Sequence, residues 1–288
     1  MHSISVKEFL SWEKEQITKG GNRESLSLLL ELIGGISQDK LNLIRINSEG
    51  NLNLKRNLDL IESIWEKHIF NFVPIQYLTG YTFWRDLKLS VSEIVLIPRP
   101  ETELLIDIVL DIFKTNSKKL IFAELGTGSG AISIALAIAN PLWEGIATDI
   151  DENAIKIASK NFINSSNQKN LKFYCGHWWN PLENLKGKLD FVVSNPPYIP
   201  DEIYEKLPKE VKNFEPKIAL LGGKDGLTHI REIIQQAPLY LKEKGWLIIE
   251  NHFDQGAKVI KLFLENKFTS VKVLKDFSGI GRFTIGRY

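Results

Sequence analysis

The sequence is poor in cysteine, in long apolar runs and in unbalanced charge, and each shortage excludes a class of protein. Cys175 is the single cysteine in 288 residues, so no disulfide forms within the chain and zinc sites built from several cysteines are excluded. No apolar stretch approaches the roughly 18 residues of a membrane span, and the N-terminal segment, with its early acidic residues, is unlike a signal peptide. The 36 Lys and Arg balance 35 Asp and Glu, which indicates no polybasic surface. We therefore expect a cytoplasmic monomer with no membrane partner and no stable nucleic-acid partner.

The chain divides into three predicted regions. Residues 1–78 are predicted to form a small helical domain, because Asn57 precedes a segment with helical periodicity and a leucine-rich run stops at Gly34 and Gly35. Residues 79–98 are predicted to form a connecting β-hairpin. Their apolar side chains fall at odd positions, as in a half-buried strand, namely Phe83, Leu87, Leu89 and Val91.

The third region, residues 99–288, alternates between strand and helix patterns. Such alternation is typical of an α/β domain with a mostly parallel sheet that is covered on both faces. The predicted helices are residues 101–113, 129–139, 151–163, 226–245 and 254–266. The predicted strands are residues 119–125, 145–150, 171–176, 189–195 and 245–250, and residues 270–288 are expected to add two more.

A glycine-rich loop lies between the first predicted strand and the following helix of this domain. Gly126, Gly128 and Gly130 allow a sharp turn and a close approach of a ligand. No Gly-Lys-Ser/Thr follows, so the loop is not a phosphate-binding P-loop. Glu124 would repel a phosphate but attract the positive charge of S-adenosylmethionine, and Asp149, which ends the next strand, is placed to bind ribose hydroxyls. The structural alternative is a tight strand-to-helix turn with no ligand.

Two aromatic residues follow the third strand of the domain. Trp178 is placed to pack on adenine, although a core tryptophan is the structural alternative. His177 is more simply read as a surface or capping residue than as a ligand. The five histidines of the chain are scattered without metal-ligand spacing, so no metal is expected.

A proline-rich turn follows the strand at residues 189–195. Asn195, Pro196, Pro197 and Tyr198 form a rigid corner in the ligand crevice, because two prolines cannot continue a central strand. The turn suits a primary amide as methyl acceptor. Its two N–H groups would donate to the Asn195 side-chain oxygen and the Pro196 carbonyl, and Tyr198 would stack on the flat amide. A purely structural turn explains the prolines but not the residues that flank them.

The glycine loop and this turn together resemble class I S-adenosylmethionine-dependent methyltransferases that act on planar nitrogen. These include adenine-N6 and cytosine-N4 DNA methylases and protein glutamine methylases. The segments PIQYLTG (residues 74–80), LIPRPETE (96–103) and EPKIALLGGKDGL (215–227) narrow the choice. With them, the chain is identified as a member of the peptide chain release factor glutamine methyltransferases, the PrmC/HemK family. The resemblance implies a Rossmann-like, mostly parallel seven-stranded sheet.

The resemblance also implies a reaction and a role for each motif. A methyl group would pass from S-adenosylmethionine to N5 of the glutamine in the Gly-Gly-Gln loop of bacterial release factors, leaving S-adenosylhomocysteine. The helical domain would recognise the substrate. Catalysis is assigned to Asn195, Pro196 and Tyr198, and substrate binding to Asn195, Pro196, Pro197 and Tyr198. Cofactor binding is assigned to Glu124, Gly126, Thr127, Gly128, Ser129, Gly130, Asp149, Trp178 and Asn195.

Some segments depart from the family pattern or have no assigned role. His177 stands where the family has aspartate, and Glu250-Asn251-His252 and residues 276–281 are looser than usual. Residues 199–226 are long and polar and are predicted to form a substrate-facing lid, with an ordinary solvated connection as the alternative. Arg99 would contact substrate or lid, or form a structural salt bridge.

Three other functions remain open from the sequence. A glutamine of ribosomal protein L3 is one alternative substrate. Adenine N6 in nucleic acid is another, but it requires a flipped base and a basic channel, which the balanced charge does not favour. The non-enzymatic alternative is an S-adenosylmethionine-binding, RNA-interacting protein, which would have no need of the Asn-Pro-Pro-Tyr turn.

Overall fold

The computed structural model describes residues 2–114 and 118–288, so the first residue of the predicted helical domain lies outside it. The chain forms two units. One comprises Met1–Thr82 with Pro208–Phe214, and the other comprises Phe83–Leu207 with Glu215–Tyr288. The domain boundaries expected at residues 78 and 98 stay predictions. In the described ranges, no helix has both the length and the apolar character that crossing a bilayer requires.

The first unit is mainly helical. As predicted, Asn57 caps a helix by accepting a hydrogen bond from the Leu60 backbone N–H at 3.3 Å. The leucine-rich run ends at Gly35, whose φ of 74° closes a π-helix at Leu30–Gly34. The strands β1 (His2–Ser5) and β2 (Asn51–Leu54), which pair antiparallel, were not predicted. The helices are α1 (Val6–Lys19), α2 (Arg23–Leu29), α3 (Gln38–Ile46), α4 (Leu58–Asn71), α5 (Ile75–Thr79) and α10 (Lys209–Phe214).

The predicted hairpin is present as β3 (Tyr81–Trp84) and β4 (Leu87–Ser90), which form a two-stranded sheet. The inward position of Phe83 was predicted wrongly: its side chain is 51% exposed, while Trp84 is buried. Two residues separate the strands, so the buried positions are even-numbered in β3 and odd-numbered in β4. The prediction assumed that odd-numbered residues are buried throughout the hairpin, which holds for β4 but not for β3.

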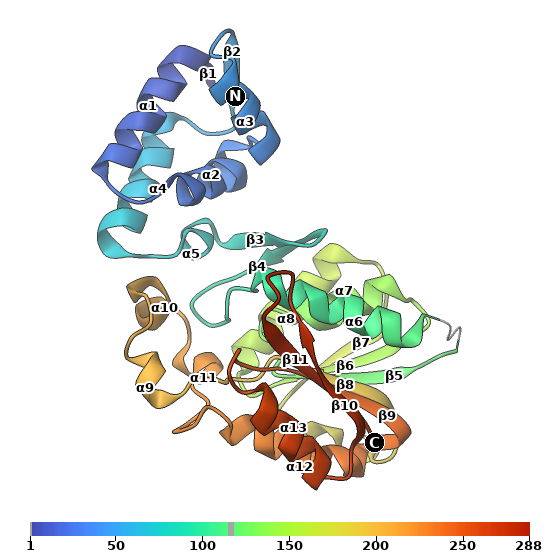
Figure 1. Ribbon diagram of the computed structural model, residues 1–288. Coiled ribbons are helices and arrows are strands. Elements are labelled where there is room, and N and C mark those ends of the chain that lie inside the picture. The colour runs from blue at the N-terminus through green and yellow to red at the C-terminus, as the bar shows by residue number, and fades with distance from the viewer. Residues whose placement is uncertain (1, 115–117) are drawn as a thin grey trace. The chain divides into compact units, whose positions relative to one another are not determined.

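The second unit is built on a seven-stranded sheet with the order β10-β11-β9-β8-β5-β6-β7 (Figure 1). Strands β5 to β9 are parallel, and β11 is antiparallel to both β9 and β10. The mostly parallel sheet predicted from the sequence is therefore confirmed. Its strands are β5 (Ile121–Leu125), β6 (Glu144–Asp149), β7 (Leu171–Cys175), β8 (Leu189–Ser194), β9 (Leu241–Glu250), β10 (Thr269–Lys275) and β11 (Gly281–Arg287).

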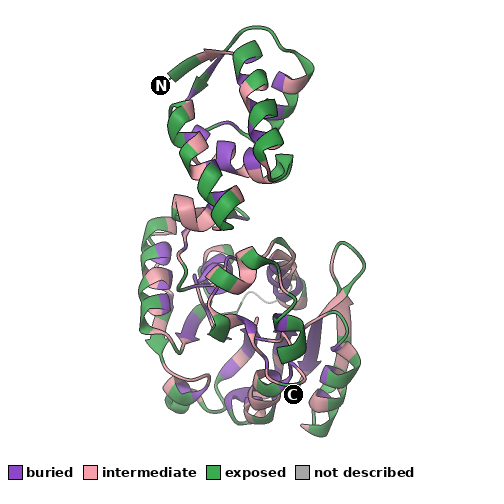
Figure 2. Ribbon diagram, turned by 90° about the vertical axis from the view of Figure 1, so that its left-hand side faces the viewer, coloured by how far each residue is buried: buried purple, intermediate pink, exposed green. Residues whose placement is uncertain are grey.

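Helices pack on both faces of this sheet, and buried residues follow its strands (Figure 2). Because successive strand residues point to opposite faces, Phe122 and Phe191 stack at 5.1 Å in one core cluster. Ala123 and Val192, their neighbours, lie in the other. The first cluster contains residues of α6 (Glu103–Phe113), α7 (Ala131–Ala139) and α8 (Glu152–Ser165), and the second contains residues of α12 (Thr228–Tyr240) and α13 (Gly256–Glu265).

One helix is shorter than its sequence suggests. The helix predicted over residues 226–245 ends at Tyr240, and β9 begins at Leu241. Leu241 turns into the extended region with ψ 144°, pairs with Leu189 of β8 and is buried. Strand pairing and burial of Leu241 therefore override the helical propensity of the Lys-rich segment that follows it.

The register of the sheet brings distant parts of the sequence to one edge. Leu125 of β5 pairs with Thr148 of β6 and with Ser194 of β8, and Ser194 pairs with Ile249 of β9. The strand order reverses between β5 and β8, which is where open α/β sheets bind ligands. The next residues along these four strands therefore lie side by side at this point, namely Gly126, Asp149, Asn195 and Glu250.

Candidate functional site

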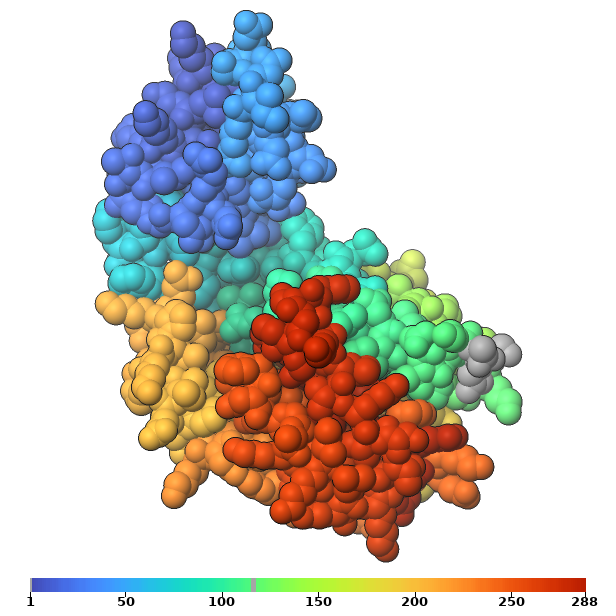
Figure 3. All heavy atoms as spheres, in the orientation of Figure 1, coloured from blue at the N-terminus to red at the C-terminus, as the bar shows by residue number. Residues whose placement is uncertain are grey.

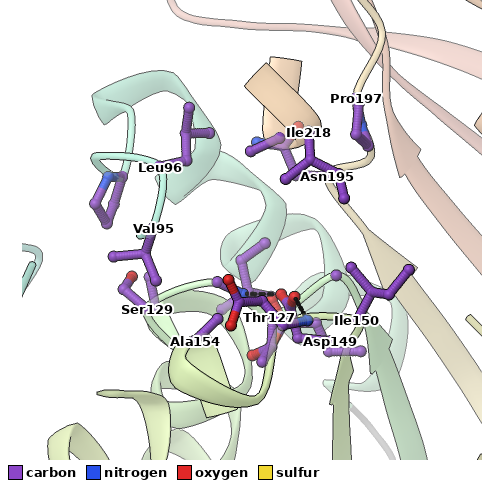
Figure 4. Close-up of a pocket in the computed structure, with 18 of the residues that line it drawn as sticks. Val95, Leu96, Thr127, Ser129, Asp149, Ile150, Ala154, Asn195, Pro197 and Ile218 are labelled. Atoms are coloured by element: carbon purple, nitrogen blue, oxygen red, sulfur yellow. Dashed lines mark hydrogen bonds between the residues drawn. The ribbon is translucent and has the colours of Figure 1, made fainter. Parts of the chain in front are cut away.

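A cavity opens at this edge of the sheet, within the second unit (Figure 4). In the view shown, Asn195 and Ile218 lie on one side of it and Thr127 and Asp149 on the other. Both motifs singled out in the sequence therefore face one space. The predicted site residues that line the cavity are Glu124, Gly126, Thr127, Gly128, Ser129, Asp149, Trp178, Asn195 and Pro197.

The glycine loop has a backbone that only glycine adopts without strain. Gly126, Gly128 and Gly130 all have positive φ angles, of 76°, 54° and 86°. A Cβ on Gly130 would approach the Ile134 side chain to 2.8 Å, so this glycine allows α7 to pack closely. A Cβ on Gly128 would meet nothing within 4 Å, because this part of the loop borders open space. Gly130 thus supports the loop from behind, while Gly126 and Gly128 line the cavity.

Glu124 divides its two carboxylate oxygens between the loop and the cavity. Oε2 accepts hydrogen bonds from Thr127 Oγ1 at 2.5 Å and from the Ser133 N–H at 3.0 Å. Both of these bonds reach Oε2, and the residue lines the cavity. Burial raises the pKa of this carboxyl to about 7. Glu124 therefore both shapes the loop and leaves one acceptor for a ligand.

Asp149 anchors the loop from the neighbouring strand. Its Oδ2 accepts from the Gly128 N–H at 2.8 Å and its Oδ1 from the Asp151 N–H at 3.0 Å (Figure 4). Burial raises the pKa of this carboxyl, and the backbone donors oppose that rise. Each carboxylate oxygen accepts more than one hydrogen bond, so both retain capacity toward the cavity. The sequence suggested the ligand-facing part of this role but not the bonds to the loop.

The aromatic residues after β7 separate into a core residue and a cavity residue. Trp179 is fully buried and stacks on Tyr240 at 4.5 Å. Trp178 has a positive φ of 39°, which turns it to the cavity, and its buried Nε1 has no partner in the described chain. His229 lines the same wall at 5.6 Å from the Trp178 ring. His177 also lines the cavity and lies 3.2 Å from Glu232, so it is not only a surface residue, and its role stays open.

The proline turn is held on several sides. Asn195 Nδ2 donates to Thr102 Oγ1 at 3.3 Å, and the Tyr198 hydroxyl donates to Glu250 Oε1 at 3.2 Å. Gln255 Nε2 donates to the Tyr198 carbonyl at 2.9 Å. Asn195 and Pro197 line the cavity, whereas Pro196 and Tyr198 do not contribute to the lining formed by the described residues. The roles assigned to these four residues from the sequence stay predictions.

The segment after this turn has its own structure. It contains α9 (Asp201–Tyr204), α10 and α11 (Lys217–Leu220), and a parallel bridge joins Ile199 to Leu221. Arg99 forms an ion pair with Glu215 of this segment at 2.8 Å and also lines the cavity. Arg99 therefore makes the structural salt bridge that was one of the two expectations, while its contact with substrate, and the lid role of this segment, stay predictions.

Residues 276–281, which depart from the family's sequence pattern, form a tight turn. Asp276 accepts hydrogen bonds from the Ser278 and Ile280 N–H groups, both at 2.9 Å, and from Arg282 Nε at 2.6 Å. Phe277 is 85% exposed in this turn, which lies on the surface of the second unit (Figure 3). The motif therefore closes the β10–β11 hairpin.

Several residues of the site region were not identified from the sequence, and three of them are polar residues that hold the two motifs in place. Thr102 lines the cavity and accepts from Asn195, and the buried Glu250 accepts in turn from Thr102. Asn161 of α8 is fully buried; it exchanges hydrogen bonds with the Ser90 backbone at 2.8 and 3.0 Å and donates to the Ser129 carbonyl at 2.9 Å. It thereby ties the hairpin to the glycine loop. The sequence feature that could have identified Asn161 is its position as a polar residue on the buried face of an amphipathic helix.

The charge of the cavity indicates the kind of ligand it accepts. Glu124, Asp149 and Asp151 supply carboxyl groups to its wall, and Arg99 is already paired with Glu215. Such a wall favours a cationic ligand with hydroxyl groups and disfavours a pyrophosphate. No group of three or more His, Cys, Asp or Glu side chains within residues 2–114 and 118–288 is arranged to hold a metal ion.

Comparisons with known folds and families agree with this geometry. The family model described as "Methyltransferase small domain" matches residues 102–207. The hMettl16 catalytic domain, solved in complex with MAT2A 3′UTR hairpin 1, is 18% identical with a TM-score of 0.57, covering 70% of this chain and 74% of that one. A methyltransferase from Pyrococcus furiosus is 19% identical with a TM-score of 0.51, covering 70% and 89%. At these identities the structures support the fold alone.

Similarity to curated sequences extends over nearly the whole chain. The release factor glutamine methyltransferase of Prochlorococcus marinus is 39% identical over 281 residues, which cover 97% of this chain and 96% of that protein. The release factor glutamine methyltransferase of Bacillus subtilis is 34% identical over 293 residues and covers 96% of each chain. The resemblance inferred from the motifs is therefore confirmed, and the chain belongs to the release factor glutamine methyltransferase family.

Proposed function

We propose that this protein transfers a methyl group from S-adenosylmethionine to the side-chain amide nitrogen, N5, of the glutamine in the Gly-Gly-Gln loop of bacterial peptide chain release factors. One observation carries the proposal: the acidic glycine loop and the proline-locked Asn195 turn line the same cavity. A family of release factor glutamine methyltransferases supplies the substrate class. A base methylase is less well supported, because Arg99 is the only Lys or Arg among the described lining residues and is paired with Glu215. A pure binding protein is less well supported, because it would have no need of the Asn195 turn.

The donor set of the cavity fits S-adenosylmethionine. Glu124 Oε1 would accept from its amino group, and Asp149 would accept from its ribose hydroxyls. Trp178 would pack on the adenine, and Gly126 and Gly128 would allow the ligand to approach the backbone. When bound, this cofactor supplies a methyl group on a positively charged sulfur. We assign the remaining predicted cofactor residues, Thr127, Ser129, Gly130 and Asn195, to shaping and closing the same space.

The protein's own groups would hold the substrate amide. A primary amide nitrogen is a poor nucleophile, because its lone pair is delocalised into the carbonyl. Asn195 Oδ1 and the Pro196 carbonyl would each accept one N–H hydrogen, and the Tyr198 ring would lie on the amide plane. The buried prolines keep these acceptors fixed, so they need not be reordered during reaction. Positioning of this kind contributes roughly 7–11 kcal/mol to catalysis in well-oriented systems.

We assign substrate recognition to the helical region at residues 1–78 and catalysis to residues 99–288, joined by the hairpin at residues 79–98. The exposed apolar side chains of α3, Leu43 at 66% and Ile46 at 85%, support a protein-binding role for the helical region. We place the protein in the cytoplasm, because its proposed substrates act there in translation; the monomeric state stays a prediction from the sequence.

The proposed reaction is tested with methyl-labelled S-adenosylmethionine and a purified bacterial release factor. We expect label on the wild-type release factor and none on a variant whose Gly-Gly-Gln glutamine is replaced by alanine. Ribosomal protein L3 and DNA serve as competing acceptors in parallel reactions. Label on L3 or DNA alone would reject the release factor as substrate, and binding of the cofactor with no transfer to any acceptor would favour the non-enzymatic alternative.

The affinity for S-adenosylmethionine is expected to fall at acid pH. The raised pKa of Glu124, about 7, means that the carboxylate is mostly ionised at pH 8 and mostly protonated at pH 6. Because the cationic ligand needs the ionised form, the apparent Kd should rise about tenfold between pH 8 and pH 6. Calorimetry at both pH values measures this change. Glu124→Gln should bind more weakly at pH 8 and lose most of the pH dependence; an equally steep dependence in the variant would assign it to another group.

A further inference from the structure

Glu250 is a buried acid that the proposed chemistry does not yet use. It ends β9, is 0% exposed, and forms no ion pair within the described part of the chain. Its two oxygens are each committed to one neighbour: Oε2 accepts from Thr102 Oγ1 at 2.7 Å and Oε1 accepts from the Tyr198 hydroxyl at 3.2 Å. A buried carboxylate without a paired cation lowers the stability of the fold. We therefore expect Glu250 to have a function behind the proline turn.

The bonds around Thr102 have a fixed direction. A threonine hydroxyl has one hydrogen, and Thr102 gives it to Glu250. Its oxygen is then left as an acceptor, and Asn195 Nδ2 donates to it at 3.3 Å. The two ends of an asparagine amide are distinguished by such networks. With Nδ2 engaged by Thr102, Oδ1 is the end of Asn195 that remains for the cavity.

We infer that Glu250 is a positioning residue for methyl transfer, which sets the orientation of the Asn195 amide through Thr102 and fixes Tyr198 through its second oxygen. The inference rests on the proposed function, because it requires an amide substrate that donates to Asn195. Thr102 transmits the effect, and its side chain makes no cap hydrogen bond to α6. Glu250 does not contribute to the cavity lining formed by the described residues, and Thr102, which does, is assigned the role of holding Asn195.

Protonation of Glu250 would reverse this chain of hydrogen bonds. A protonated carboxyl donates to the Thr102 oxygen, and the Thr102 hydroxyl then donates to Asn195 Oδ1. Asn195 Nδ2 would face the substrate, where it meets N–H groups instead of an acceptor. Activity should therefore be lost as pH falls through the pKa of Glu250.

The surroundings of Glu250 place this transition near neutral pH. Burial raises the pKa of the carboxyl to about 7. Glu101 raises it further, while Thr102, Tyr198 and Arg282 lower it. The ionised form, and with it the productive orientation of Asn195, is favoured above this pH.

The test compares full-length Thr102→Val and Glu250→Gln with wild type on a release factor, at saturating S-adenosylmethionine so that Glu124 does not limit the rate. For wild type, kcat should fall about tenfold between pH 8 and pH 6. Thr102→Val keeps the shape of the side chain but breaks the chain of hydrogen bonds from Glu250 to Asn195. Its kcat at pH 8 should fall about tenfold, with the cofactor Kd unchanged. Glu250→Gln has no ionisable group, so kcat at pH 8 should be lower than in wild type and nearly constant down to pH 6.

Matched variants separate this role from loss of folding. Thr102→Ser restores the hydroxyl and should restore kcat, and Glu265→Gln makes the same change at an exposed position of α13 and should have no effect. The Tm of each variant at pH 8 checks its fold. If Glu250→Gln is unstable, Thr102→Val alone tests the inference. A Glu250→Gln variant with the wild-type kcat and pH profile, or a Thr102→Val variant with the wild-type kcat, overturns the inference alone. A wild-type protein that leaves the release factor unlabelled overturns the proposed function and the inference with it.

Discussion

The Asn195→Ala variant is expected to turn over release factor about 10²–10³-fold more slowly than wild type while binding S-adenosylmethionine almost as tightly. The estimate follows the loss of one preorganised polar group from an active site. Asn195 stands at the end of β8, its Nδ2 is held by Thr102, and its side chain lines the cavity. Alanine would remove the acceptor for one amide hydrogen and leave the backbone of the turn in place.

Single-turnover kinetics and calorimetry measure the two halves of this prediction separately. Asn184→Ala, which removes an exposed asparagine side chain from the same unit, should change neither quantity and serves as the control. Unchanged turnover would contradict the role assigned to Asn195. A weakening of cofactor binding as large as the loss of turnover would instead make Asn195 chiefly a cofactor residue.

The parts of the fold that sequence predicted best are those in which local pattern and packing agree. The alternating strands and helices after residue 119, the cap at Asn57 and the stop at Gly35 all follow from residue type and spacing. The errors occur where the pairing of strands that are not yet known from the sequence determines the structure. The sequence around Leu241 favours a helix, but Leu241 pairs with Leu189 and begins β9. Phe83 is exposed because the buried positions are even-numbered in β3 and odd-numbered in β4.

The candidate site shows the same division. Glu124, Asp149 and Asn195 were found because each is a polar residue at the carboxyl end of a buried strand. Glu250 ends β9 in the same way, and the register places it next to Asn195. It was treated only as part of a variant motif, because the sequence does not say which strand neighbours β8. Thr102 gave no such signal, since its role depends on a contact across 148 residues of chain.

Asp149→Ala is expected to raise the Kd for S-adenosylmethionine about 10- to 100-fold, the second large effect. A hydrogen bond to a charged group contributes about 1.5–3 kcal/mol, and the alanine variant would lose the acceptor for the ribose hydroxyls. It would also release the Gly128 N–H, which Asp149 holds at 2.8 Å, so the loop would have to be ordered by the ligand itself. Both losses weaken binding, whereas kcat at saturating cofactor should change much less.

Asp149→Asn separates these contributions, because its single carbonyl oxygen can replace only part of the carboxylate. We expect its Kd to lie between those of wild type and Asp149→Ala. Asp39→Ala, an exposed acid in the other unit, controls for a general effect of lost negative charge. Calorimetry at pH 8 with Tm measured on the ligand-free proteins distinguishes a damaged site from a damaged fold. A dissociation constant equal to that of wild type in Asp149→Ala would remove this residue from the cofactor site.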